Sequence, residues 1–149
     1  MEKKYKLTEE TINVDGRTLY RIEALKDFDV VEKGDKGGFI ENESNLSQSG
    51  DCWVYENAKV YGNAEVYDDA KVYGNAWVFD NAKVFEDAEV FGIAEVCGDA
   101  VVYCDAKVFG NAQVYDNAKV SGNTQVYENA KVYENAKVFE DAEVFGIAE

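Results

Sequence analysis

Valine recurs at every sixth position of this chain from Val54 to Val144, sixteen times without interruption. An alanine stands four residues after each valine, with Thr124 as the one exception. An aromatic residue usually follows the valine, and Gly, Asp, Glu or Asn fill the next two positions. Helices need apolar residues three and four positions apart, so this period excludes them. Each unit instead predicts a short strand, favoured by valine and aromatic residues, and a bend, favoured by Gly, Asn and Asp.

Three such hexapeptide units would close one triangular coil and give an 18-residue period. The segment 83–95 recurs identically at 137–149, an offset of nine units, which agrees with three whole coils. Stacking at this period also places opposite charges on neighbouring strands of one face, a pairing that stabilises sheets; that face reads Trp53, Lys71, Glu89, Lys107, Gln125, Glu143. We therefore predict an all-β parallel β-helix with valines inside the prism and alanines in its corners. Asparagine at the bends tolerates left-handed backbone angles and can form hydrogen bonds along the stack.

Residues 1–50 lack the repeat and are expected to cap the solenoid of residues 51–149, because the open end of a repeat stack needs a cover. The run from Thr11 to Ile22 predicts a β-hairpin that turns at Asp15-Gly16. The last repeat carries no comparable cap, and an open strand edge invites pairing. Homodimerisation through that C-terminal coil is therefore left open.

Two further expectations concern the junction between the cap and the coils. Gly34, Gly37 and Gly38 predict a loop. Leu46 and Cys52 fall in register with the inward alanines, so both are expected to be buried in a first coil that begins near Ile40.

The chain is strongly acidic, with 30 Asp and Glu residues against 15 Lys and Arg, a formal charge of −15 and a pI near 4.3. Such a field repels nucleic acids and anionic membranes and attracts basic protein surfaces. Neither a signal peptide nor a stretch of membrane-spanning length is visible. The three cysteines, Cys52, Cys97 and Cys104, form no metal-binding or redox motif. These features predict free thiols and a cytoplasmic protein.

Besides the repeat, the chain contains several short motifs that are informative about its family: residues 24–28, Gly37-Gly38, residues 45–48, residues 50–54 and the Asn-Ala-x-Val-Tyr-Gly-Asn-Ala runs. With these motifs, the rhythm of a branched apolar residue, three variable residues and a small residue resembles the hexapeptide-repeat superfamily. It is most similar to a subgroup common in phages and prophages and often labelled as transferases. The resemblance implies a left-handed β-helix and a phage protein acting inside a bacterial host cell.

The resemblance also suggests that the protein is an enzyme. The amino-acid sequence argues against catalysis. Acyltransferases of that superfamily use a histidine as general base, and its carbonic anhydrases use histidines to hold zinc, whereas this chain has no histidine. We therefore predict no catalytic residue, no metal site and no cofactor. A divergent acyltransferase that uses another base is retained as the catalytic alternative.

Stacking of successive coils gathers acidic bend residues at one corner of the prism, here called the acidic corner. Carboxylates about 4.8 Å apart repel one another, so the arrangement costs stability unless something compensates. Solubility, calcium binding and mimicry of nucleic acid are the interpretations considered. The candidate partner-binding residues of the acidic corner are Asp68, Asp69, Glu86, Asp87, Asp105, Glu140 and Asp141.

The aromatic residue after each valine is expected to point outward, so that the aromatics form three stacks along the rod. Such stacks either shield the backbone by self-stacking or form an exposed apolar contact surface. One corner is more apolar than the others, because isoleucine twice replaces a bend asparagine there. The candidate oligomer or partner surface at this apolar corner comprises Phe91, Ile93, Phe109, Phe145 and Ile147.

The leading hypothesis is a non-catalytic acidic solenoid that binds a basic protein partner and does not bind nucleic acid or membranes directly. The resemblance to phage proteins suggests a nucleic-acid mimic that inhibits a nucleic-acid-binding or defence protein of the host. The structural alternative is a self-assembling scaffold that uses the aromatic faces or the C-terminal coil.

Overall fold

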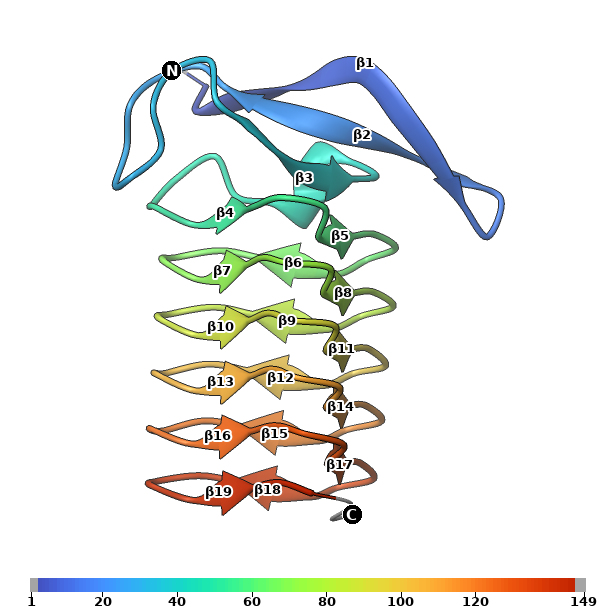
Figure 1. The fold of residues 1–149 in the computed structure, drawn as a ribbon, viewed down its shortest axis with the longest axis vertical. Coiled ribbons are helices and arrows are strands. Elements are labelled where there is room, and N and C mark those ends of the chain that lie inside the picture. The colour runs from blue at the N-terminus through green and yellow to red at the C-terminus, as the bar shows by residue number, and fades with distance from the viewer. Residues whose placement is uncertain (1–2, 147–149) are drawn as a thin grey trace.

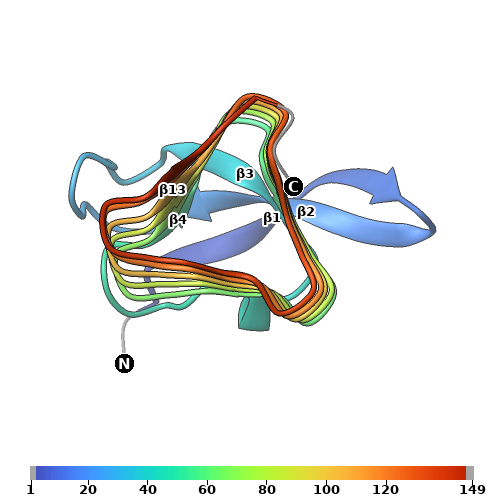
Figure 2. The same cartoon turned by 90° about the horizontal axis from the view of Figure 1, so that it is seen from below.

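A computed structural model describes residues 3–146 and confirms an all-β solenoid with an N-terminal antiparallel hairpin. The hairpin lies across one end of a stack of triangular coils (Figures 1 and 2). The chain descends in Figure 1 while β7 (Lys71–Val72) runs to the right in front and β9 (Lys83–Val84) runs back to the left behind. The solenoid is therefore left-handed.

Each coil contributes one two-residue strand to each of three sheets, and each strand pairs in parallel with the equivalent strand of the next coil. Sheet I contains β4 (Trp53–Val54), β7, β10 (Glu89–Val90), β13 (Lys107–Val108), β16 (Gln125–Val126) and β19 (Glu143–Val144). Sheet II contains β5 (Lys59–Val60), β8 (Trp77–Val78), β11 (Glu95–Val96), β14 (Gln113–Val114) and β17 (Lys131–Val132). Sheet III contains β6 (Glu65–Val66), β9, β12 (Val101–Val102), β15 (Lys119–Val120) and β18 (Lys137–Val138).

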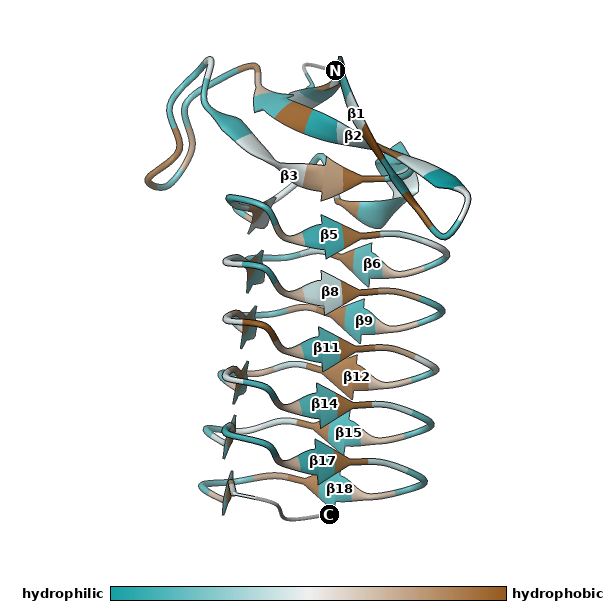
Figure 3. Cartoon of the chain, turned by 45° about the vertical axis from the view of Figure 1, so that its right-hand side comes forward, coloured by the Kyte–Doolittle hydropathy of each residue, from teal (hydrophilic) through white to brown (hydrophobic). Residues whose placement is uncertain are grey.

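The valine column forms the core, as the period predicts. Every valine of the repeat from Val54 to Val132 is at most 3% exposed, and Thr124 is buried among the alanines of the corners. Figure 3 shows the alternation on the strands, where a mostly polar residue precedes an apolar one, and the apolar residue is the inward valine. Burying a valine side chain stabilises a fold by roughly 1.5–3 kcal/mol. The core is therefore a continuous apolar column along the rod.

The left-handed bend residue is the one before the asparagine, and the asparagine forms hydrogen bonds along the stack as expected. The first bend residue, which is Gly, Asp, Glu or once Cys104, has positive φ throughout the repeat, as in Gly62 (68°) and Asp80 (61°). The asparagine one position later uses its side chain to link coils, since Asn63 Nδ2 donates to Asn81 Oδ1 at 3.1 Å. Glycine costs least at the first bend position because an L side chain is strained at positive φ.

The cap continues sheet II beyond the coils. β1 (Tyr5–Val14) and β2 (Arg17–Ala24) pair antiparallel and turn at Asp15-Gly16, which confirms the predicted hairpin with longer strands. β2 pairs antiparallel with β3 (Lys36–Ile40), and β3 pairs parallel with β5. The hairpin and β3 thus add three strands to sheet II.

Gly37 and Gly38 lie inside β3, so the predicted loop is wrong at these two positions, although Gly34 does take a turn conformation with φ of 95°. A Cβ on Gly37 would approach Val54 O to 2.5 Å, and one on Gly38 would approach Ala58 O to 2.5 Å. The two glycines are needed because β3 crosses directly over the first coil. Close approach of two backbones, rather than a turn, explains them.

The first coil is two residues longer than the others. Ile40 pairs with Val60 and Leu46 bridges Val66, so each pairing spans two positions more than in the regular coils. The 3-10 turn at Glu43–Asn45 lies within a step of regular length from Ile40 to Leu46, so the extra residues fall between Leu46 and Val54. Leu46 is buried as predicted but takes a valine position rather than an alanine position. The longer coil displaced the register that the 18-residue period assigned to it.

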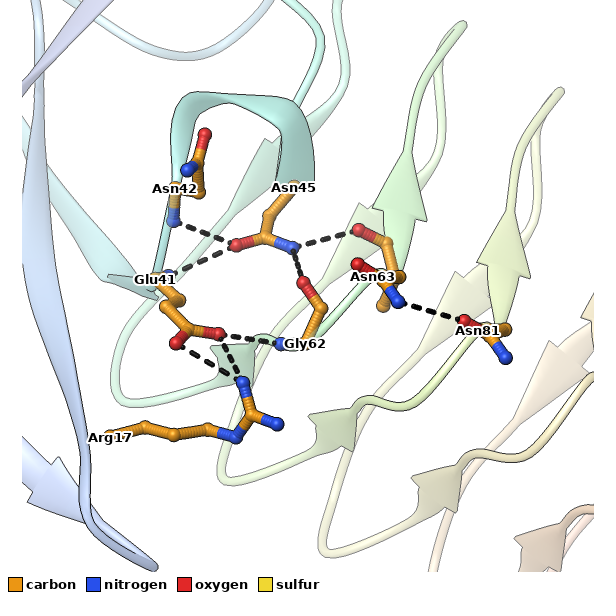
Figure 4. A network of polar contacts seen from close by, with 8 residues as sticks. Arg17, Glu41, Asn42, Asn45, Gly62, Asn63 and Asn81 are labelled. Atoms are coloured by element: carbon orange, nitrogen blue, oxygen red, sulfur yellow. Dashed lines mark hydrogen bonds and ion pairs between the residues drawn. The ribbon is translucent and has the colours of Figure 1, made fainter.

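Polar contacts lock this longer coil to the cap (Figure 4). Glu41 Oε1 accepts from Arg17 Nη1 of the hairpin and from the Gly62 N–H of the next coil, both at 2.9 Å. The buried Asn45 side chain accepts from the Asn42 N–H at 2.8 Å and donates to the Ala64 carbonyl at 2.8 Å. The irregular coil therefore keeps its backbone groups satisfied without a regular ladder.

Gly38→Ala should lower the free energy of unfolding by about 1–3 kcal/mol, because the methyl group would press into the first coil. Chemical denaturation would measure the loss. Lys36→Ala in the same strand is the control, since Lys36 is exposed, and its effect should stay small. Equal stabilities of the two variants would contradict the close-packing explanation of Gly38.

Candidate partner-binding surface

The acidic corner exists and follows the edge where sheet III leads into sheet I. Its second bend residues are Asp69, Asp87, Asp105 and Asp141, with Asn123 as the neutral level, and all are exposed. Backbone hydrogen bonds align the levels, since the N–H of Asp87 donates to Cys104 O at 2.9 Å. The side chains therefore form a straight row with one residue per coil, about 4.8 Å apart.

The seven predicted acids are not equivalent. Asp68, Glu86 and Glu140 are first bend residues with positive φ. Asp68 Oδ2 accepts from the Glu86 N–H at 3.3 Å, so this carboxylate helps to join coils. Asp69 Oδ1 accepts from the Asp51 N–H at 3.1 Å. Such bonds allow some of these acids a structural role.

The row begins one coil earlier than the sequence interpretation placed it. Asp51 stands one full period before Asp69, and its N–H bonds to the Asp69 carboxylate. The repeat period could have identified Asp51, but the irregular first coil obscured where the repeat starts.

The acids of this corner have no ion-pair partner within residues 3–146. The four ion pairs of the described residues are Lys3–Glu43, Arg17–Glu41, Arg21–Glu10 and Lys71–Asp29, and none lies in the row. Repulsion between stacked carboxylates is therefore not relieved by an ion pair with a lysine or arginine of the described residues. The corner is available to an external cation or basic surface.

The apolar corner is smaller than the sequence suggested, because ring faces are used in stacking. Phe91 and Phe109 are half-buried and stack with centroids 4.8 Å apart and planes at 1°. Ile93 and Phe145 are 56% and 51% exposed. Ile147 lies outside the described residues. Self-stacking thus accounts for most of the aromatic column, and the exposed remainder is narrow.

The structure brings the two predicted surfaces onto one face. Each coil crosses sheet I from the acidic corner to the aromatic column, as in the run Asp87, Glu89, Phe91, Ile93. Sequence reasoning treated them as separate corners of the prism. They are the two edges of sheet I, with the alternating column of Lys71, Glu89 and Lys107 between them. A partner lying along sheet I would contact both.

A shallow pocket of about 370 Å³ lies where the acidic corner meets sheet I. Its lining is polar apart from side-chain stems, and it includes the buried Thr124, whose hydroxyl has no hydrogen-bond partner in the described part of the chain. The lining residues are Asp87, Glu89, Asp105, Lys107, Asn123, Thr124 and Gln125.

The cysteines are free, with Cys52 buried and the other two half-buried. Burial, with the carboxylates of Asp80 and Glu95 nearby, raises the pKa of the Cys97 thiol to about 11. A thiol with a raised pKa is a poor nucleophile at neutral pH. Within residues 3–146, no three His, Cys, Asp or Glu side chains converge on a metal position. No helix in that range is long and apolar enough to cross a membrane.

Comparison with known proteins gives two matches to one kind of repeat. The family model described as YdcK Beta solenoid repeat matches residues 112–128. The protein named "Uncharacterized acetyltransferase YdcK" of Escherichia coli (strain K12) is 39% identical over 69 residues, which cover 40% of this chain and 21% of that protein. The chain thus matches about a fifth of that relative's length. These likenesses support a YdcK-type β-solenoid repeat.

Asp87→Asn with Asp105→Asn should raise the free energy of unfolding by about 0.5 kcal/mol at low salt, since neutral amides remove the repulsion between stacked carboxylates. Amide side chains at this position can also link coils, as Asn63 and Asn81 do. Denaturation at low and high salt would measure the gain, which should shrink with salt. A loss of stability would show that the carboxylates are needed for the fold.

Proposed function

We propose that this protein is a non-catalytic binding protein whose acidic corner engages a basic protein surface. The observation that carries the proposal is a straight, exposed row of carboxylates, one per coil except at Asn123, without ion pairs among residues 3–146. The row costs stability, and a partner that supplies lysine and arginine would offset that cost. Solubility alone would not require the charges to lie in one row.

The spacing of the row supports a more specific proposal, mimicry of a nucleic acid. A nucleic-acid strand is also a regular line of negative charges, which basic clefts recognise with little regard to sequence. A rigid rod with its charges held by backbone hydrogen bonds loses little conformational entropy on binding. In this proposal the chain, as a phage protein, would occupy the nucleic-acid cleft of a host protein and block it.

The apolar edge of sheet I would contribute a smaller, salt-insensitive part of the contact. Ile93 and Phe145 are its most exposed described members. A scaffold that assembles through this edge is less favoured, because the stacked rings leave only a narrow apolar surface.

The test compares two variants with the same net charge. The first carries Asp69→Asn, Asp87→Asn, Asp105→Asn and Asp141→Asn in the acidic corner. The matched control carries Glu65→Gln, Asp99→Asn, Glu128→Gln and Glu134→Gln, which are exposed and lie elsewhere. The probe is protamine, a basic DNA-binding protein, and the readout is release of labelled duplex DNA from it.

The wild type should displace the DNA, and its affinity for protamine should fall steeply with salt. The acidic-corner variant should bind protamine at least about tenfold more weakly, a loss of roughly 1.4 kcal/mol, while the control variant stays within about threefold of the wild type. Circular dichroism would check that both remain folded. Equal losses in the two variants would mean that net charge, and not the row, attracts the probe.

Acetyl transfer is the second candidate, favoured by the name of the matched relative, an acetyltransferase. Since the chain has no histidine, a carboxylate or lysine would have to act as general base. Release of coenzyme A from acetyl-coenzyme A in the presence of amine and hydroxyl acceptors would support this candidate, and a rate equal to that without protein would remove it.

A further inference from the structure

A pocket at the cap end of sheet I is not part of the acidic corner. Its volume is about 240 Å³, and Val30 from the loop between β2 and β3 forms one wall. The other walls come from the first coils: Tyr55, Glu56, Lys71, Tyr73 and Glu89. Val30 is 73% exposed, the highest value among the large apolar side chains of the described residues, so the loop holds an apolar group beside the pocket without burying it.

The two tyrosines depart from the pattern of the aromatic column at this point. Farther along, the rings stack in parallel, as Tyr73 does on Phe91 with centroids 4.7 Å apart and planes at 3°. Tyr55 and Tyr73 instead meet at 82° with centroids 6.1 Å apart. The parallel stack therefore ends at Tyr73, and Tyr55 packs edge-to-face against it, with both rings lining the pocket.

Two carboxylates lie beside these rings. Glu89 Oε1 accepts from the Tyr73 hydroxyl at 2.9 Å, and Glu56 Oε1 accepts from the Gly74 N–H at 3.3 Å, which fixes both acids beside the pocket. The one cation in the lining, Lys71, is already paired with Asp29 at 3.5 Å. Negative charge therefore exceeds positive charge around an aromatic lining.

The two tyrosines have groups that make no polar or cation–π contact in the described part of the chain. The Tyr55 hydroxyl oxygen is buried and has no hydrogen-bond partner within residues 3–146. Burial, with Asp29 and Glu89 nearby, raises the pKa of Tyr55 to about 12, so this hydroxyl stays protonated at neutral pH. The cation–π contacts of the described residues belong to Phe28, Phe39 and Trp77, and none uses Tyr55 or Tyr73.

We infer that this pocket binds a small organic cation, an alkylated ammonium group with an apolar body. Aromatic faces attract such ions through their quadrupole, and nearby carboxylates add to the attraction. A neutral apolar group would gain only the burial of its surface. The pocket would act independently of the acidic corner, so this inference does not rest on the proposed function.

The first experiment compares choline with neohexyl alcohol, its neutral isostere, by NMR titration of the aromatic signals. Choline should bind about 3- to 30-fold more tightly than the alcohol, the range that a cation–π contact supplies. Equal affinities would show a merely apolar pocket, and no saturable binding of choline would overturn the inference.

Variants then locate the site. Tyr73→Ser should abolish choline binding, and Tyr127→Ser, in the same column but outside the pocket, should not change it. Serine is tolerated at an equivalent position, where Ser121 stands. Glu89→Gln keeps an acceptor for the Tyr73 hydroxyl and should weaken choline at least about threefold by removing the charge.

The acidic-corner variant should bind choline as the wild type does, which separates this site from protamine binding. If Tyr73→Ser does not fold, Glu89→Gln still decides the question. Choline binding unaffected by Glu89→Gln, or weakened equally by Tyr127→Ser, would place the cation elsewhere on the acidic surface and overturn the inference.

Discussion

The backbone ladder between successive coils is the interaction on which the rest of this structure depends. Lys71 and Tyr73 each donate an N–H to the next coil at 3.0 Å, and the same pattern repeats along the rod. Because the ladder fixes the spacing, every position of the repeat becomes a straight column. Valine columns then form the core, ring columns stack, and carboxylate columns cannot move apart to relieve their repulsion. The features of sheet I follow from this single constraint.

The columns explain why one face carries opposing properties. A carboxylate at Asp87 is held near Asp105 by the backbone, and that repulsion is a cost that a flexible chain would avoid. Across the same sheet, Phe91 gains from the same rigidity, because its ring lies at stacking distance from Phe109. A rigid solenoid thus presents charge and apolar surface side by side, in an arrangement that a binding partner can match without reorganising the protein.

Much of the solenoid could be predicted from sequence, because its determinants are local and periodic. The valine period, the 18-residue register and the outward charge column of Lys71, Glu89 and Lys107 all appear in the structure as predicted. The acidic corner was also found from spacing alone, because stacking converts spacing into proximity. Its binding role remains a proposal.

The features that the sequence did not predict depend on contacts between segments that are distant in sequence. The sequence predicts that Gly38 belongs to a turn, whereas the structure places it in β3, where that strand crosses the first coil. The register of Leu46 follows from two extra residues that no period reveals. The perpendicular setting of Tyr55 against Tyr73, beside a loop from the cap, has no counterpart in the repeat pattern. Periodicity predicts the structure of the coils but not the contacts between the coils and the cap.

Because each coil bonds only to its two neighbours, whole coils can be gained or lost without disturbing the others. The identical segments 83–95 and 137–149 are what duplication of such units would leave behind. Adding a coil would lengthen the acidic row by one level at unchanged spacing. The number of coils therefore sets the length of the charged row. Evolution could match that length to a target by adding or removing coils, without redesigning the fold.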